Sequence, residues 1–301
     1  MAYDVDDEIR AAVFGYLDRQ RDLYGDRIPW TVLQAFEYRD RRRALITQRG
    51  IRWLSGFPAL TFMTTYSADP RRAPYADHVG VDGFPRYKYQ GVDPTRADNM
   101  AMKTAEVAGK PLVWFVGTGE GVYAATYPVY IIGHNDLELE FTIALDEEQR
   151  ALWDEPRVSP GIRRHHVLRL TWQRLHQPIF RSQVLHAYQT RCTICRLGHA
   201  PLLDAAHILA DADGGEPVVT NGMAMCKIHH AAYDAYLISV TPDYRVDVAT
   251  SVLEEADGPM LQHGLKEVHG WSIQLPRRRA EIPDRDLLAQ RHSRYLSRVG
   301  A

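Results

Sequence analysis

The chain has 301 residues, of which 45% are hydrophobic and 25% are charged, and its formal net charge is −2. These values are ordinary for a globular protein with room for two domains, and the net charge alone does not indicate a nucleic-acid binder. No apolar run approaches the roughly 20 residues that span a bilayer. The acidic start MAYDVDDEIR lacks the apolar core of a secretory leader. We therefore expect a cytoplasmic protein with no membrane partner.

The first half of the sequence predicts one N-terminal helix followed by many short strands. Residues 1 to about 25 combine an acidic start with apolar residues at helical spacing. A shorter helix is predicted over MAMKTAEVAG (100–109). Strands are predicted over 61–66, at the start of 85–99, and over 111–117, 127–133 and 139–145. Many short strands with one helix predict a small β-barrel or curled sheet over about residues 25–148.

Residues 158–189 are predicted to form a helical connector. The segment opens with the linker-like VSPG (158–161), and residues 163–188 are expected to be mostly helical with a break near Pro178. The second half of the connector has an apolar face that is expected to be buried. That face consists of Phe180, Val184, Leu185 and Tyr188.

The connector belongs to a longer basic stretch. Between Arg157 and Leu203 there are eight arginines and no Asp or Glu. Such a stretch can lie along a phosphate backbone, or it can be a basic surface paired with acidic residues elsewhere in the chain. The candidate contacts to a DNA backbone are Arg163, Arg164, Arg169 and Arg174.

All three cysteines of the chain fall in one metal-binding pattern. Cys192 and Cys195 form a CxxC, and Cys226 with His229 forms a CxxH about 30 residues later. Two such half-sites supply the four nitrogen and sulfur ligands of a closed structural zinc site. An odd, low cysteine count argues against a disulfide framework. A redox CxxC would need a βαβ context, which this stretch lacks.

A second set of residues, His207, Asn221 and His230, is interleaved with the zinc half-sites. Their order is CxxC, AAH, a loop containing two adjacent glycines, NG, and then CxxHH. This stretch resembles an HNH nuclease module, the ββα-metal fold, of the McrA-like kind that carries cysteines. The nesting of the three residues between two zinc half-sites makes the resemblance much more specific than the loose HNH pattern alone.

The resemblance implies a role for each residue of the second set. His207 would be the base that activates water, Asn221 would brace the hairpin, and His230 would bind a catalytic ion such as Mg²⁺. The sequence departs from many ββα-metal nucleases at position 206, where alanine replaces a second metal ligand. The alternatives for that ligand are two aspartates. Asp204 lies on the same face of the strand as position 206, and Asp234 lies one helical turn after His230.

The pentapeptide CKIHH (226–230) is expected to serve both metals. Successive helical residues are rotated by about 100°, so His229 and His230 cannot easily point at one ion. Cys226 and His229 share a face toward the CxxC, whereas His230 is expected to face His207.

The segments RYKYQGVDPTRADN (86–99), GKPLVWFVG and YPVYIIG resemble the N-terminal domain of bacterial HNH proteins thought to be modification-dependent restriction enzymes. That domain is related to SRA/PUA barrels, which read a modified cytosine after flipping it out of the duplex. The candidate pocket residues are Tyr87, Tyr89, Asp93, Asp98 and Trp114. Alternatively, the aromatic residues belong to the core and the aspartates form turns.

We therefore expect an α+β protein with an SRA/PUA-like barrel over residues 1–157, the connector over 158–189 and an HNH domain with a C-terminal extension over 190–301. The expected function is cleavage of double-stranded DNA that carries 5-methyl- or 5-hydroxymethylcytosine, using structural Zn²⁺ and a catalytic divalent ion. One HNH centre nicks one strand, so a homodimer is expected. The alternatives are a phosphorothioate-dependent nuclease, a modification-independent nuclease and a non-catalytic DNA-binding protein.

Overall fold

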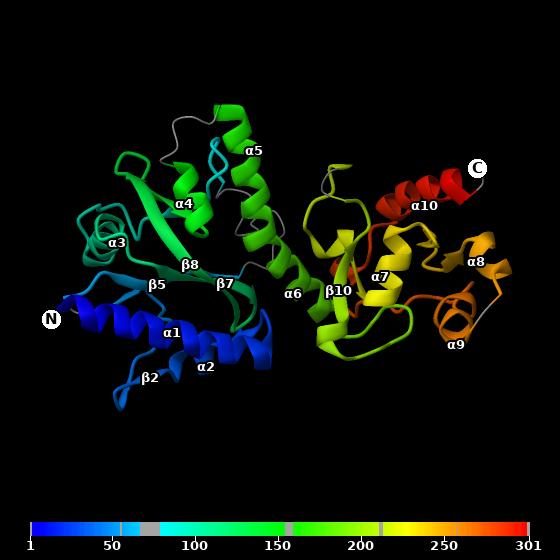
Figure 1. Cartoon of the computed structure of the whole chain (residues 1–301), viewed down its shortest axis with the longest axis horizontal. Helices are drawn as coiled ribbons and strands as arrows, with labels where there is room; N and C mark the ends of the chain where they lie inside the picture. Colours follow the sequence, from blue (N-terminus) through cyan, green and yellow to red (C-terminus); the bar gives the residue numbers. More distant parts are fainter. Residues whose placement is uncertain are drawn as a thin grey trace. The chain divides into compact units, whose positions relative to one another are not determined.

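The structure, a computed structural model, describes residues 2–54, 56–66, 79–153, 159–210, 213–256 and 258–299. The chain divides into two compact units, Met1–Ile179 and Phe180–Ala301 (Figure 1). This division falls inside the segment predicted as a connector, and the three predicted domain borders stay predictions. Within the described part of the chain, no helix has both the length and the apolar character needed to cross a membrane.

The first unit is built around a seven-stranded sheet that curls into a half-barrel. Its strands are β1 (Ile28–Pro29), β4 (Ile51–Trp53), β5 (Ala59–Thr64), β6 (Arg86–Lys88), β7 (Leu112–Gly119), β8 (Val122–Asn135) and β9 (Glu140–Ala144). The order is β4-β5-β7-β8-β9-β6, and β1 also pairs with β8. Only β5 and β7 run parallel among these pairs. The long β8 pairs with β7 along its first part and with β9 along its second, which bends the sheet.

Both faces of this sheet are covered, as expected for β7, whose eight residues are all buried. Val113 and Phe115 pack in the cluster that contains helix α1 (Ala2–Tyr24), which runs along the sheet in Figure 1. Leu112, Trp114 and Val116 pack on the opposite face with α3 (Ala97–Val107). The remaining short elements of this part are α2 (Trp30–Gln34), β2 (Glu37–Tyr38), β3 (Arg41–Arg42) and α4 (Glu147–Trp153).

The predicted connector is helical, but the expected break near Pro178 has a different form. Helix α5 (Pro160–Thr171) continues through a π turn, η2 (Trp172–His176), into α6 (Gln177–Ala187). Proline has no N–H, and in a regular α-helix its ring would meet the carbonyl four residues earlier. The turn ahead of Pro178 is widened, with the Gln177 N–H bonded to the Trp172 carbonyl, so the helix adjusts rather than ending.

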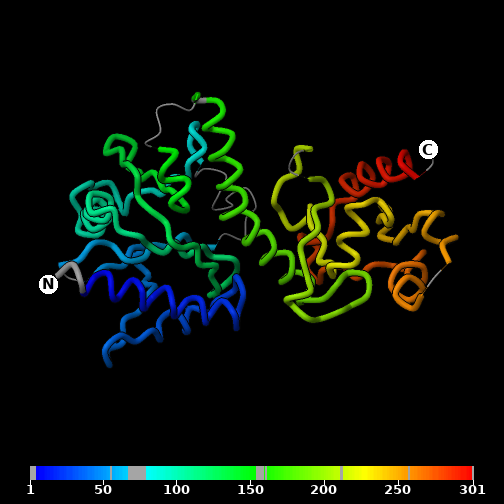
Figure 2. Tube along the Cα trace, viewed as in Figure 1, coloured from blue at the N-terminus to red at the C-terminus, as the bar shows by residue number. Residues whose placement is uncertain are grey.

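The second unit contains a ββα arrangement followed by a C-terminal extension. Strands β10 (Leu203–His207) and β11 (Gly222–Cys226) form an antiparallel hairpin, and α7 (Lys227–Asp234) follows β11 directly. Figure 2 shows this path in the yellow-green to yellow part of the trace. The other elements are η3 (Ala200–Leu202), η5 (Val219–Asn221), β12 (Ile238–Val240), β13 (Val246–Val248), α8 (Thr250–Glu254), α9 (Pro259–Leu261), η6 (Gln262–Lys266), η7 (Arg279–Glu281) and α10 (Arg285–Val299).

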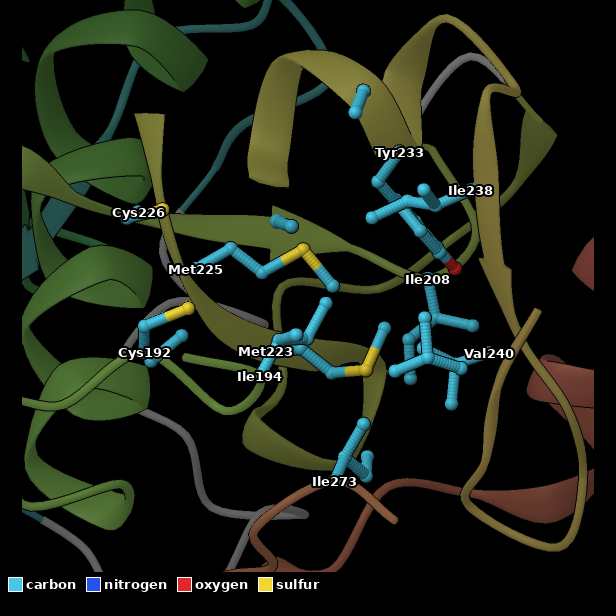
Figure 3. Packing of buried hydrophobic residues seen from close by; sticks show 14 of the residues in the cluster. Cys192, Ile194, Ile208, Met223, Met225, Cys226, Tyr233, Ile238, Val240 and Ile273 are labelled. Atoms are coloured by element: carbon cyan, nitrogen blue, oxygen red, sulfur yellow. The ribbon is translucent and has the colours of Figure 1, made fainter. Parts of the chain in front are cut away.

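One hydrophobic cluster holds the second unit together. The face predicted for the connector helix is buried, because Phe180, Val184, Leu185 and Tyr188 are each at most 6% exposed. Met223 and Met225 of β11 fill the centre of the cluster, and the extension contributes Ile273 (Figure 3). Cys192 and Cys226 lie together at one side of this core in the same view. The core thus places the two cysteine half-sites beside each other.

Candidate functional site

The four predicted zinc ligands converge in the second unit. Their ligand atoms, three Sγ atoms and one ring nitrogen, all lie within 4.8 Å of one another. The Sγ atoms of Cys195 and Cys226 are 3.9 Å apart. The Nδ1 atom of His229 lies 3.5 Å from the Sγ of Cys192 and 3.2 Å from that of Cys226. Among the described residues, this is the one group of three or more possible ligands that gathers so closely.

These distances fit a tetrahedral zinc ion. Zn–S bonds of about 2.3 Å and Zn–N bonds of about 2.0 Å place two sulfurs about 3.8 Å apart and a sulfur and a nitrogen about 3.6 Å apart. The other ring nitrogen of His229, Nε2, lies 2.8 Å from the Gly264 carbonyl oxygen. A carbonyl can only accept, so Nε2 carries the proton and the Nδ1 lone pair faces the thiolates. The residues present therefore fit zinc.

The burial of the cluster also suits a structural ion. Cys192, Cys226 and His229 are each at most 5% exposed, whereas Cys195 is exposed. Hydrogen bonding with Cys195 and Cys226 holds the pKa of the Cys192 thiol well below its usual value, although burial raises it. The same contacts, with Cys192 and Cys226, raise the pKa of the Cys195 thiol, so the close packing favours a thiolate at Cys192 but not at Cys195. A divalent ion would bind the thiolate form of all three.

The hairpin places His207 at the end of β10 next to the connecting loop, opposite Gly222 of β11. The imidazole of His207 is partly buried and stacks on the ring of Phe180, with centroids 4.0 Å apart and an angle of 17° between the planes. A Cβ at Gly222 would lie 2.5 Å from Val184 and 2.8 Å from Phe180. Glycine at 222 therefore lets α6 approach the hairpin and hold the His207 ring from one side.

Asn221 braces the loop that joins the two strands. Its Nδ2 donates to the carbonyls of Leu209 and Glu216, and its Oδ1 accepts from the Leu209 N–H, each at 2.9 Å. The side chain is fully buried. A Cβ at Gly215 would meet the Leu209 carbonyl oxygen at 1.9 Å and Asn221 at 2.8 Å, so the double glycine predicted as a turn also leaves room for this brace. This geometry is the one expected for the Asn of the motif.

His230 lies between the two aspartates that were predicted as alternatives. Its Nδ1 is 3.7 Å from the Asp204 carboxylate, and its Nε2 is 3.3 Å from that of Asp234. Asp204 also contacts Lys227 at 3.0 Å and Arg181 at 3.7 Å. Burial raises the pKa of Asp204, but the hydrogen bond and charge of Lys227, with the charges of His230 and Arg181, hold it below its usual value.

The two adjacent histidines of α7 separate as the helical rotation predicts. His229 is buried among the thiols, whereas the His230 side chain is 26% exposed and faces carboxylates. Three contributors to this region were missing from the sequence reasoning, namely Phe180, Lys227 and the Gly264 carbonyl. The apolar face of the helix predicted that Phe180 is buried, but not that it stacks on His207. The contact of the Gly264 carbonyl could not be predicted, because every residue has a backbone carbonyl. Asp204 and Asp234 both stay predictions for the second metal ligand.

The aromatic residues predicted for a base pocket lie in the core of the first unit. Tyr87 and Tyr89 are each 6% exposed and Trp114 is fully buried. The Tyr87 hydroxyl donates to the Met63 carbonyl at 3.1 Å, and the Tyr89 hydroxyl donates to Asp136 at 2.6 Å. These contacts give each hydroxyl a partner within the unit, as in the alternative interpretation that places the aromatic residues in the core.

The two predicted aspartates also have partners within the first unit. Asp98 is 3% exposed and pairs with Arg96 at 2.8 Å. The Asp93 carboxylate accepts from the backbone and hydroxyl of Thr95, a local turn contact. The role of this set in reading a base stays a prediction.

The arginines predicted to contact a DNA backbone have mixed surroundings. Arg174 pairs with Asp146 at 2.5 Å and approaches Glu148 at 3.9 Å. Arg164 donates to the Val81 carbonyl at 2.8 Å. The acid-free stretch is thus compensated in part by acidic residues around α4, as in the alternative interpretation. Arg163 is partly buried and Arg169 is exposed.

The comparison with known families identifies the centre of the second unit. The model of the HNH endonuclease family matches residues 192–241, so the chain carries an HNH endonuclease domain there. This range includes both zinc half-sites and the three interleaved residues His207, Asn221 and His230. The HNH domain predicted from the sequence is therefore confirmed. No curated protein matches the chain.

Two solved structures are similar to the chain at low identity. "Modification dependent TagI restriction endonuclease" is 16% identical and covers 82% of this chain and 85% of its own, with a TM-score of 0.30. "Structure of the Type IV phosphorothioation-dependent restriction endonuclease ScoMcrA" is 17% identical, with a TM-score of 0.21. That match covers 61% of this chain and 52% of the other.

Proposed function

We propose that the chain is a metal-dependent DNA endonuclease that cuts DNA carrying modified cytosine. The observation that carries the nuclease part is the ββα hairpin and helix of the HNH domain. It presents His207 on β10 and His230 on α7, with the loop braced by Asn221. The zinc cluster next to this helix gives the small module the stability that its limited core cannot supply alone.

Each residue has a defined task in phosphodiester hydrolysis. His207 takes the proton from the attacking water, and the Phe180 ring fixes its imidazole plane. Asn221 holds the loop that carries this base in one conformation. His230, with Asp204 or Asp234, would hold the divalent ion. When bound, that ion stabilises the charge that develops on the leaving oxygen.

The proposal assigns modification reading to the first unit. Its support is the resemblance of segments 86–99, 109–117 and 127–133 to an SRA/PUA-like reader, together with the curled half-barrel sheet on which they lie. Reading by base flipping needs an aromatic surface and polar groups for the base edge. Because the predicted tyrosines already donate within the core, the flipped base would have to be held by groups other than their hydroxyls.

The test compares the wild type with His207→Ala on plasmid DNA that is unmodified, 5-methylated, 5-hydroxymethylated or phosphorothioated. We expect Mg²⁺-dependent cleavage by the wild type on the cytosine-modified forms, and binding without cleavage by His207→Ala. Equal cleavage of all forms would refute modification dependence. Binding without cleavage by both proteins would refute the nuclease assignment. Cleavage confined to the phosphorothioated plasmid would show that the protein recognises phosphorothioate and not modified cytosine.

The proposal includes a homodimer, because each HNH centre acts on one strand. Sedimentation of the protein with and without a modified duplex is expected to show two copies on the DNA. A strictly monomeric species that cuts both strands in one binding event would refute the dimer.

A further inference from the structure

A depression of about 190 Å³ lies on the second unit beside the zinc cluster. Three arginines are among the residues that line it, namely Arg191, Arg196 and Arg277. Arg191 and Arg196 flank the CxxC, whereas Arg277 comes from the C-terminal extension, some eighty residues away in the chain. A phosphate group is small enough to enter this space, and an arginine fork matches its oxygens.

The three guanidiniums concentrate positive charge without nearby carboxylates. None of them has an Asp or Glu oxygen within 4.0 Å among the described residues, although Arg191 donates to the Arg196 carbonyl at 3.2 Å. With zinc bound, three thiolates against one divalent ion give the metal cluster a single negative charge. That charge offsets one guanidinium and leaves a surplus of two, which an anion can neutralise.

The backbone at Arg196 determines which substitution best tests this residue. Its φ is +64°, in the left-handed region that costs a residue with a Cβ about 1 kcal/mol and favours glycine. Glycine at this position would therefore remove the guanidinium and relieve the backbone in one substitution.

The frame around the depression is rigid. The Gln274 N–H donates to the Thr193 carbonyl at 2.8 Å, and the Thr193 hydroxyl donates to the Gln274 carbonyl at 2.7 Å. This pair fixes the segment that carries Arg277 against the loop that carries Arg196. The backbone segments that carry Arg196 and Arg277 are therefore held together before an anion binds, so only side-chain entropy is lost when the arginines close on it.

We propose that this arginine depression binds a phosphate of the DNA backbone, outside the centre formed by His207 and His230. The inference rests on the proposed function in taking DNA as the partner. A phosphate held here would anchor the duplex on the zinc knuckle, so that the metal cluster and its extension serve substrate binding as well as folding.

The test measures the salt dependence of DNA binding. Full-length, zinc-loaded His207→Ala protein is titrated with a labelled duplex at several KCl concentrations, next to the same protein with Arg196→Gly or Arg277→Ala. Loss of one phosphate contact is expected to lower the slope of log K against log salt by about 0.9. At about 0.15 M salt this slope corresponds to a loss of affinity on the order of fivefold. Arg196→Gly is expected to keep its zinc and to melt no lower than its parent, because glycine relieves the backbone.

The matched control is Arg278→Ala, which removes the same charge one residue from Arg277 but from a guanidinium already 3.5 Å from Glu281. If the control lowered the slope of log K against log salt by the same amount, the effect would come from the overall charge of the surface and not from the depression. Loss of zinc in Arg196→Gly would assign the arginine to the metal cluster. Inorganic phosphate, added at constant ionic strength, could raise the melting temperature of the parent but not that of Arg196→Gly. If the salt dependence of DNA binding were also unchanged between the two proteins, the depression would be a site for a free anion. Each of these outcomes overturns the proposal.

The outcome separates this inference from the proposed function. A parent protein that binds no DNA refutes both. A parent that binds DNA with a slope that the arginine variants leave unchanged refutes only the arginine depression.

Discussion

Replacement of Asn221 by alanine should destabilise the second unit more than almost any other polar substitution. The side chain is fully buried and makes three hydrogen bonds of 2.9 Å to the backbone at Leu209 and Glu216. Alanine leaves one N–H and two carbonyls without that partner. At about 1–2 kcal/mol for each, the loss is roughly 3–6 kcal/mol. Because domains are stable by only about 5–15 kcal/mol, the hairpin loop should open frequently.

The assay is urea unfolding combined with amide hydrogen exchange of residues 203–226. We expect the unfolding midpoint to fall and the Leu209 amide to exchange much faster in Asn221→Ala. The control is Asn135→Ala, because Asn135 also accepts from two backbone N–H groups, those of Leu137 and Glu138, but is exposed. A loss below about 1 kcal/mol in Asn221→Ala, or an equal loss in the control, would refute the brace.

Asn221→Asp refines this prediction through pH. The ionised carboxylate would face two carbonyls, so its pKa in the folded protein should rise above the unfolded value, whereas the protonated acid can still donate to one carbonyl. Relative to the wild type at the same pH, the variant is then least destabilised below the unfolded value of about 3.9, and the difference in stability grows as pH rises through the folded pKa. A difference from the wild type that stays constant or shrinks between pH 4 and 8 would contradict the geometry.

Three further predictions concern the two metals and the hairpin. His229→Ala should lose zinc and unfold the second unit, since structural zinc contributes on the order of 10 kcal/mol. His230→Ala should retain its zinc, its folded structure and its DNA binding, but it should not cleave. Metal analysis and circular dichroism distinguish the two variants. Of Asp204→Asn and Asp234→Asn, the variant of the true ligand should need on the order of tenfold more Mg²⁺ for half-maximal cleavage, and an unchanged Mg²⁺ requirement in both variants would exclude both. Gly222→Ala should slow cleavage and cost about 1–3 kcal/mol, because its Cβ meets a side chain of α6 at 2.5 Å; unchanged activity would exclude a role for that contact.

The metal-binding half of the molecule was predictable because its signals are local in the sequence. Cys226 and His229 lie three residues apart, so one helical turn decides that they share a face, and the gathering of the four possible metal ligands follows from their spacings in the sequence. The rotation between His229 and His230 is equally local. What spacing cannot supply is a partner from a distant segment, and for that reason Phe180 behind His207 was missing.

The first half was predicted as a list of strands, but its topology was not. The strand predicted over 127–133 lies inside β8, which runs from Val122 to Asn135, because the turn at Glu120 and Gly121 is shorter than the glycines suggested. The helix expected from residue 100 begins at Ala97, where Asn99 makes side-chain bonds to the preceding loop. Aromatic residues looked equally suitable for a pocket and a core, since alternation places both on one face of a strand.

The hydrogen bond from His229 to the Gly264 carbonyl couples the proposed zinc site to a turn of the C-terminal extension. Gly264 lies in the π turn Gln262–Lys266, which contributes no metal ligand among the described residues. By reciprocity, the free energy by which the docked turn strengthens the metal site equals the free energy by which the metal holds the turn in place. Removal of the metal by a chelator should therefore be detected first as protease sensitivity near Gly264. Substitutions in this turn would change the metal affinity without altering any cysteine or histidine ligand.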